Sequence, residues 1–250
     1  MKSEPVVEAG GTASPEEVAR FTAMAEAWWD PLGKFKPLHR FNPVRLDFMR
    51  RHFAAHFGRD AAEMRPFEGL TLLDVGCGGG LLSEPLARMG FAVTGIDAGA
   101  RNVAVAALHA EQSGIAIDYR VSTPEALDPG LSFDVVLCME VVEHVTDVAV
   151  FLEAAAQRLK PGGLFVGATL NRTAKCWALA VVGAEYILRW LPKGTHDWNK
   201  FVRPSEFSAM LRGVGIEVRR MAGMAYSPLT DTWRETENLD INYMVLGVKR

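Results

Sequence analysis

The sequence predicts an α/β fold, in which helices cover both faces of a mostly parallel sheet. Apolar runs rich in strand-forming residues alternate with helical patterns between residues 71 and 168. The run at 70–75 opens directly into a segment with four glycines, and the next run ends in an acidic residue, Asp97. Alternation of this kind sets parallel strands side by side and brings the segments that follow them to one edge of the sheet.

The chain is expected to begin with a tail and a short helix. Residues 1–13 are small and polar, which predicts a disordered tail. Ser14 then has the features of a helix cap, because a proline follows it and Glu17 stands three residues later. We expect this first helix to extend to about Trp28.

A second helix should lead into the main domain. Prolines and glycines interrupt residues 29–43, which predicts a loop, and helical spacing resumes over 44–57. Residues 14–62 therefore form an expected helical cap, and 63–250 form the main domain. Within that domain, 169–204 is far longer than an ordinary connection, which favours a lid or a substrate site.

Seven apolar runs are the expected strands, with helices between most of them. The strands are 71–75, 92–96, 116–121, 134–138, 163–168, 215–221 and 242–248. The helices are 81–89, 100–113 and 147–159. Asp147 is the expected cap of the last helix, and the Pro161-Gly162 turn should end it.

Composition excludes several classes of function. The chain has 250 residues, 49% of them hydrophobic and 23% charged, which is ordinary for a globular enzyme. A net charge of −3 argues against a nucleic-acid-binding protein. The three cysteines lack metal-type spacing, and no signal peptide or long apolar window is present, so we expect a reduced, cytoplasmic setting.

The glycine-rich segment indicates a bound nucleoside. Gly76 and Gly78 let the backbone approach a ligand closely, and Asp97, 21 residues after Gly76, is placed to accept the hydroxyls of a ribose. A NAD-type loop needs a third glycine where this chain has Leu81. The opening D-x-G-x-G-x-G, which begins at Asp74, instead resembles the first motif of class I S-adenosylmethionine (SAM) dependent methyltransferases. A tight turn without a ligand is the plainer alternative.

Methyl transfer to a phenol would need a base or a metal. A phenol has a pKa of about 10, so forming the phenolate at neutral pH costs roughly 4 kcal/mol. Glu140, Glu143 and His144 are spaced so that one helical turn would bring them toward a common face. They could together bind a magnesium ion, or His144 could act alone as general base. Alternatively, the glutamates only favour a helix N-terminus and the histidine only supports its neighbours.

Two further residues could contact the cofactor. Arg45 could bind the methionine carboxylate of SAM through two parallel hydrogen bonds, although solvation at the surface is its plainer role. Met139, just past an expected strand, could line the adenine or methionine pocket or could simply fill the core.

Several segments together resemble the UbiG-type O-methyltransferases of ubiquinone biosynthesis, over about residues 20–248. The segments that carry the resemblance are Phe41-Asn42-Pro43-Val44-Arg45, Asp74 to Gly80, Cys138 to His144, Thr169-Leu170-Asn171-Arg172, Val182 to Leu188, Pro192 to Asp197, and Asp240 to Met244. The resemblance implies a seven-stranded, mostly parallel sheet with an antiparallel C-terminal strand. It also implies O-methylation of the ring hydroxyl of polyprenylated catechol intermediates, at both methylation steps.

The resemblance also implies roles for single residues. SAM contacts are implied at Arg45, Gly76, Asp97 and Met139, and metal or proton handling at the cluster of Glu140, Glu143 and His144. It further suggests association with other enzymes of the pathway. The alternatives are a methyltransferase for another small phenol and a non-catalytic SAM-binding subunit.

The long insertion suits a substrate with a lipid tail. The segment 176–192 is mostly apolar, contains two tryptophans and is flanked by basic residues. It is too short to cross a bilayer but could lie in the headgroup layer, on the inner face of the cytoplasmic membrane. A lid helix packed on the protein's own core is the alternative.

Overall fold

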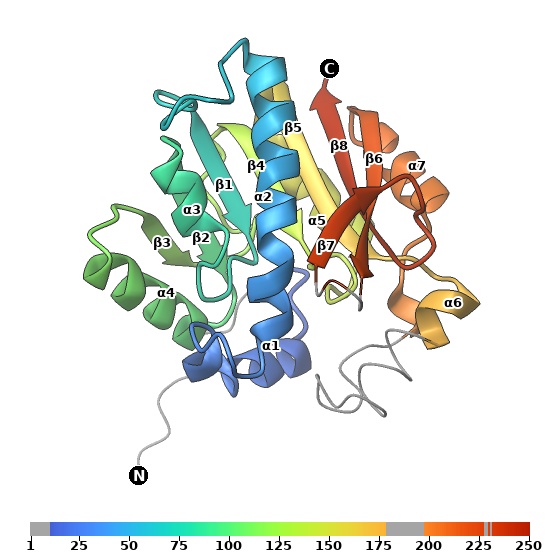
Figure 1. The fold of residues 1–250 in the computed structure, drawn as a ribbon, viewed down its shortest axis with the longest axis horizontal. Helices are drawn as coiled ribbons and strands as arrows, with labels where there is room; N and C mark the ends of the chain where they lie inside the picture. The colour runs from blue at the N-terminus through green and yellow to red at the C-terminus, as the bar shows by residue number, and fades with distance from the viewer. Residues whose placement is uncertain (1–10, 179–197, 228–229, 231) are drawn as a thin grey trace.

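A computed structural model describes residues 11–178, 198–227, 230 and 232–250. In these residues one eight-stranded sheet has the order β3-β2-β1-β4-β5-β8-β6-β7 (Figure 1). The first five strands run parallel to one another, whereas β8 runs antiparallel between β5 and β6. The predicted α/β fold with an antiparallel C-terminal strand is confirmed.

The strands follow the predicted apolar runs closely, with one addition. They are β1 (Thr71–Val75), β2 (Ala92–Asp97), β3 (Asp118–Val121), β4 (Phe133–Met139), β5 (Leu159–Leu170), β6 (Ile216–Ser227), β7 (Thr232–Thr236) and β8 (Asn242–Lys249). The expectation of seven strands missed β7, which pairs with β6 as an antiparallel hairpin. Its sequence, TWRET, has no apolar run because it is an edge strand whose single tryptophan packs on Phe41.

The helices differ from the prediction mainly before the sheet. They are α1 (Pro15–Thr22), α2 (Lys36–Phe57), α3 (Ser83–Arg88), α4 (Ala100–Gln112), α5 (Val148–Gln157), α6 (Ala174–Cys176) and α7 (Pro204–Gly213), with 3-10 turns η1 (Ala25–Ala27) and η3 (Trp198–Lys200). The first helix stops at Thr22 and does not reach Trp28. As predicted, the Asp147 carboxylate caps α5, accepting hydrogen bonds from the backbone of Ala149 and Val150.

The predicted loop at 29–43 is wrong in its second half, because α2 already begins at Lys36. Pro37 lies in the first turn, where its missing N–H costs nothing. Pro43 lies inside the helix, where a proline costs about 3 kcal/mol. Burial of Phe41, Phe48 and other side chains of the same helix offsets that cost.

Two apolar cores lie on the two faces of the sheet, with α2 in front and α5 behind (Figure 1). Alternate strand residues supply them: Leu72 and Val135 pack with α2 and α3, whereas Leu73 and Val136 pack with α5 and α7. This alternation is what a sheet covered on both faces requires.

The predicted tail ends before residue 13. Thr12 is only 5% exposed, and its hydroxyl donates a 2.6 Å hydrogen bond to Glu125. Ala13 forms an antiparallel bridge with Val145. Ser14 is the N-cap residue of α1 and Pro15 follows it directly, as predicted, but in the described part of the chain the Ser14 side chain makes no cap hydrogen bond.

Most of the insertion segment 176–192 lies outside the described residues, as do 193–197. The structure describes Trp177, which is 49% exposed, and the turn η3 beyond the gap. Of the helices in the described ranges, none combines the length and the apolar character needed to cross a bilayer. The division into a cap at 14–62 and a domain at 63–250 stays a prediction.

Candidate active site

The strand register brings the predicted site residues to one edge of the sheet. Val75 at the end of β1 pairs with Ile96 of β2 and with Cys138 of β4. Met139, the last residue of β4, pairs with Ala168 of β5. The segments after β1, β2 and β4 therefore begin side by side, as expected at the carboxyl edge of parallel strands.

The glycine loop turns sharply after β1. Gly76 and Gly78 have positive φ angles of 70° and 53°, which only glycine adopts without strain. The Gly76 N–H donates a 2.8 Å hydrogen bond to the Ile96 carbonyl, which ties the loop to β2. A side chain at position 76 would collide with Val141, 2.5 Å from an added Cβ.

Asp97 organises the loop through three hydrogen bonds. Its carboxylate accepts from the backbone N–H of Gly78 at 3.0 Å and of Gly99 at 2.7 Å. The Asn102 amide donates a third at 3.1 Å. Burial raises the pKa of Asp97, against the effect of these donors. This acid thus lies beside the glycine loop, as the spacing of the sequence predicts.

Two tryptophans of the N-terminal segment cover the loop, which the sequence analysis did not foresee. A Cβ added at Gly78 or Gly79 would lie 2.4–2.6 Å from atoms of Trp28. The Trp28 indole N–H donates to Asn102 at 3.0 Å, and that of Trp29 donates to the Gly79 carbonyl at 2.8 Å. The packing of Trp28 by itself therefore requires glycine at positions 78 and 79.

Asp74 lies inside the protein at the start of the motif. It is 3% exposed, and its carboxylate accepts a 2.6 Å hydrogen bond from the Ser83 hydroxyl at the start of α3. Burial raises the pKa of Asp74 to about 7. The residue therefore joins β1 to α3 and holds the loop between them in place.

Arg45 is buried inside the protein rather than solvated at the surface. It is 3% exposed, packs over the ring of Phe41 at 3.7 Å and pairs with Glu140. In the described part of the chain, its Nε has no partner, and neither has the buried Oδ1 of Asn42, one turn earlier on α2. A donor and an acceptor thus stand unpaired on one helix face.

Glu140, Glu143 and His144 do not converge as predicted, because residues 140–144 form a turn and not a helix. Glu140 pairs with Arg45, whereas Glu143 accepts a 3.0 Å hydrogen bond from Thr169. Among the described residues, no three histidine, cysteine or acidic side chains are arranged to hold a metal ion. The cluster therefore does not fit the expected magnesium site.

Burial and neighbouring charges change the acidity of this turn. Burial, together with the charge of Glu140, raises the pKa of Glu143 to about 7. Burial alone would lower the pKa of His144, but its hydrogen bond with Glu17 and the charges of Glu143 and Glu140 raise it. The turn therefore holds a protonatable imidazole among carboxylates at the carboxyl edge of the sheet.

His144 faces α1, which the sequence analysis missed. Its Nδ1 lies 3.1 Å from a carboxylate oxygen of Glu17, and the ring of Phe21 meets it edge-on at 5.2 Å. The hydrogen bond from His144 lowers the pKa of Glu17. The sequence had assigned Glu17 to the cap of its own helix, and no local signal connects it with position 144.

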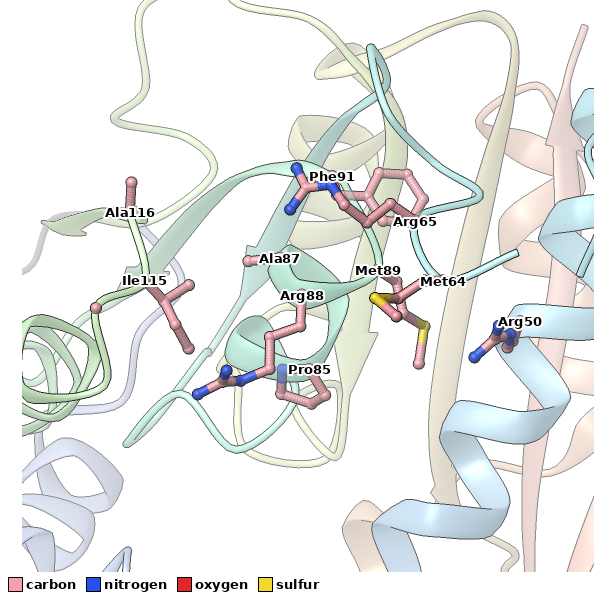
Figure 2. A pocket seen from close by; sticks show the side chains of 11 residues that line it. Arg50, Met64, Arg65, Pro85, Ala87, Arg88, Met89, Phe91, Ile115 and Ala116 are labelled. Atoms are coloured by element: carbon pink, nitrogen blue, oxygen red, sulfur yellow. The ribbon is translucent and has the colours of Figure 1, made fainter. Parts of the chain in front are cut away.

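Two other features lie outside this turn. Met139 is 8% exposed and belongs to the core on the α2 face, next to Glu140. Figure 2 shows a surface pocket lined by Arg50, Met89, Phe91 and Ile115. Phe91 and Ile115 precede β2 and β3, so this pocket opens at the opposite edge of the sheet from the glycine loop.

Comparisons with known proteins point to a methyltransferase family. Residues 47–220 match a family model described as a methyltransferase domain. The ubiquinone biosynthesis O-methyltransferase of Paramagnetospirillum magneticum is 82% identical over 96% of both chains. The chain belongs to the ubiquinone biosynthesis O-methyltransferases. The protein of the same name from Chelativorans sp. is 56% identical to this family member over 95% of this chain and 94% of its own.

Solved structures support the fold of the chain. Magnesium protoporphyrin IX methyltransferase from Synechocystis, solved with bound SAM, has a TM-score of 0.63 and 16% identity. The match covers 96% of this chain and 100% of that one. At this identity the likeness concerns the fold alone.

The residues of the site fit SAM as the cofactor of the family. The unpaired Nε of Arg45 suits a carboxylate, and the unpaired Oδ1 of Asn42 suits an ammonium group. The methionine part of SAM carries both groups. Asp97 beside the glycine loop suits the two hydroxyls of the ribose.

Proposed function

We propose that this protein transfers the methyl group of SAM to a ring hydroxyl of polyprenylated catechol intermediates in ubiquinone biosynthesis. The relatives named ubiquinone biosynthesis O-methyltransferase support O-methylation in that pathway. The observation that carries the proposal for the site is the alignment of β1, β2 and β4, which brings the loop acid and the turn of His144 to one edge, where Glu140 pairs with the buried Arg45 of α2.

SAM supplies an electrophilic methyl group on a positively charged sulfur. Arg45 would hold its carboxylate and Asp97 its ribose, while the positive φ angles of Gly76 and Gly78 shape the loop beside them. Asp74 would act indirectly through Ser83 by fixing the loop, and Met139 would line the pocket. These residues align the donor, which is the main requirement of an in-line displacement.

His144 would accept the proton of the attacking hydroxyl. Because its Nδ1 faces Glu17, the Nε2 atom is the nitrogen left for the substrate. The hydroxyl oxygen attacks the methyl carbon, the carbon–sulfur bond breaks, and the proton passes to Nε2. Glu143, through its charged form, would favour the imidazolium that results.

Turnover and SAM affinity together test this function. The purified protein, SAM and a short-chain prenylated catechol should give a methylated product, seen by mass spectrometry. We expect His144→Ala and Glu143→Ala to lower turnover at least tenfold while calorimetric SAM affinity stays near normal. Conversely, Asp97→Ala should weaken SAM binding.

Three outcomes would contradict the proposal. Binding of SAM without any product would favour the non-catalytic subunit. Equal turnover of a catechol without the prenyl chain would favour a methyltransferase for another small phenol. A parallel loss of SAM affinity in the His144→Ala variant would move that residue from proton transfer to the cofactor pocket.

Contact with a membrane surface at 176–192 is a separate part of the proposal. An exposed tryptophan next to basic residues is typical of an interfacial segment, and Trp177 is 49% exposed with Lys175 and Arg172 nearby in the chain. We expect Trp177→Ser to weaken co-sedimentation with anionic liposomes. Leu108→Ser, at a position 54% exposed on α4, is the matched control. Equal sedimentation of both variants would favour the lid.

A further inference from the structure

Glu17 and His144 meet although 127 positions separate them in the chain. The Glu17 carboxylate lies 3.1 Å from Nδ1 of the imidazole. The side chains are 13% and 18% exposed, so the contact is largely shielded from water. A shielded ion pair or hydrogen bond of this kind holds its geometry better than one at the surface.

The surrounding structure holds α1 against the turn that carries His144. Ala13 bridges Val145, and the Thr146 N–H donates a 2.9 Å hydrogen bond to the Thr12 carbonyl. The ring of Phe21, one turn after Glu17, lies edge-on to the imidazole. The approach of Glu17 to His144 is therefore part of a packed contact and not a chance meeting of long side chains.

Charged groups face this pair from several elements. Glu17 also lies 3.3 Å from Arg20 of α1 and 4.0 Å from Lys200 of η3. On the other side, Glu143 and Glu140 act on the imidazole through their charges. Glu17 differs from them because its oxygen is within hydrogen-bond distance of a ring nitrogen.

We propose that Glu17 is a positioning residue for His144, whose carboxylate accepts the Nδ1–H and so presents Nε2, unprotonated, to the acceptor hydroxyl. The inference rests on the proposed role of His144 as base. A carboxylate at one ring nitrogen fixes both the tautomer and the orientation of an imidazole. It also stabilises the imidazolium that forms when Nε2 takes the proton.

This assignment gives the N-terminal helix a role in the chemistry. The sequence places Glu17 where a helix start often uses a glutamate to satisfy its own backbone. The structure directs the carboxylate to the turn after β4 instead. A base that is complete only when α1 is docked couples folding of the N-terminal segment to turnover.

Steady-state kinetics of three variants test the inference. We expect Glu17→Ala and Glu17→Gln to lower kcat about tenfold to a hundredfold, with the KM values for SAM and for the prenylated catechol within about twofold of wild type. Glu16→Gln is the matched control, because it removes the same charge from an exposed neighbour on α1. It should keep wild-type kcat. If Glu17→Ala does not fold, Glu17→Gln still tests the inference, because glutamine keeps the side-chain volume of glutamate.

A double-variant comparison separates positioning from a merely structural role. If Glu17 acts through His144, adding Glu17→Gln to His144→Ala should lower the residual kcat no further. A further drop of tenfold in that background would overturn the inference, as would a wild-type kcat for Glu17→Gln. Wild-type turnover by His144→Ala alone would instead show that His144 is not the base. That result contradicts the proposed function and is distinguishable from a failure of the inference about Glu17.

Discussion

At the scale of single residues, Glu140 has an unusual backbone conformation. Among the described residues other than glycine, it alone has a positive φ, of 56°. A side chain in this region costs about 1–2 kcal/mol, and such strain is often kept at functional sites. Here it directs the carboxylate to the buried Arg45. Arg45 is the expected partner of the methionine carboxylate. Glu140 would therefore fix the position of the Arg45 guanidinium before SAM binds.

Comparing two substitutions isolates this strain. Glu140→Ala and Glu140→Gly both remove the carboxylate, but only glycine relieves the positive φ. We therefore expect Glu140→Gly to be the more stable of the two by about 1 kcal/mol in urea denaturation. Equal stability would show that the turn relaxes once the pair with Arg45 is lost.

At the scale of elements, the starts of α1 and α5 show that only one of two predicted caps forms its hydrogen bonds. Ser14 and Asp147 were both predicted caps, but only Asp147 accepts hydrogen bonds from its helix. The difference arises because Thr12 is anchored to Glu125 and Ala13 to Val145, which sets the backbone before α1. Packing therefore decided between two similar sequence signals.

The two caps predict different effects on stability. Asp147→Ala should lower the free energy of unfolding by about 1 kcal/mol, because it removes the acceptor for two backbone N–H groups of α5. Ser14→Ala should change it by only a few tenths. Urea denaturation followed by circular dichroism measures both. A similar loss in the two variants would mean that the Ser14 hydroxyl does cap α1 in solution.

At the scale of the whole molecule, the sheet edge concentrates buried acids. Asp74 and Glu143 both lie less than 5% exposed near the carboxyl ends of the strands. Burial raises the pKa of each to about 7. Ionisation of these buried acids lowers the free energy of unfolding, and the site keeps both acids despite this effect.

Asp74 makes stability depend on pH in a predictable direction. Its folded-state pKa, about 7, exceeds the unfolded value of about 4. Its contribution to stability is therefore complete below pH 4 and is lost as the pH rises to 7. The Asp74→Asn variant has no carboxylate to ionise at this position. Its free energy of unfolding, relative to wild type, should therefore rise between pH 4 and pH 7.

Asp134→Asn is the control for this pH series. Partial burial acts to raise the pKa of Asp134, but hydrogen bonds from Thr71 and Lys160 outweigh burial and lower this pKa. Its stability relative to wild type should therefore stay level between pH 4 and 7. Urea denaturation at pH 4, 5.5 and 7 gives both comparisons. A level difference for Asp74→Asn would contradict the raised pKa.

Local patterns in the sequence were sufficient for the α/β fold, the positions of all described strands except β7, the glycine loop and the place of Asp97. These follow from periodicity and from glycine chemistry within short segments, which the chain carries wherever it folds. The contacts of Glu17 with His144, of Trp28 with Gly79 and of Arg45 with Glu140 emerged only in the folded chain. They join residues 51 to 127 positions apart. Which side chains meet across such separations depends on how α1 and α2 pack on the sheet, and packing is a property of the whole molecule.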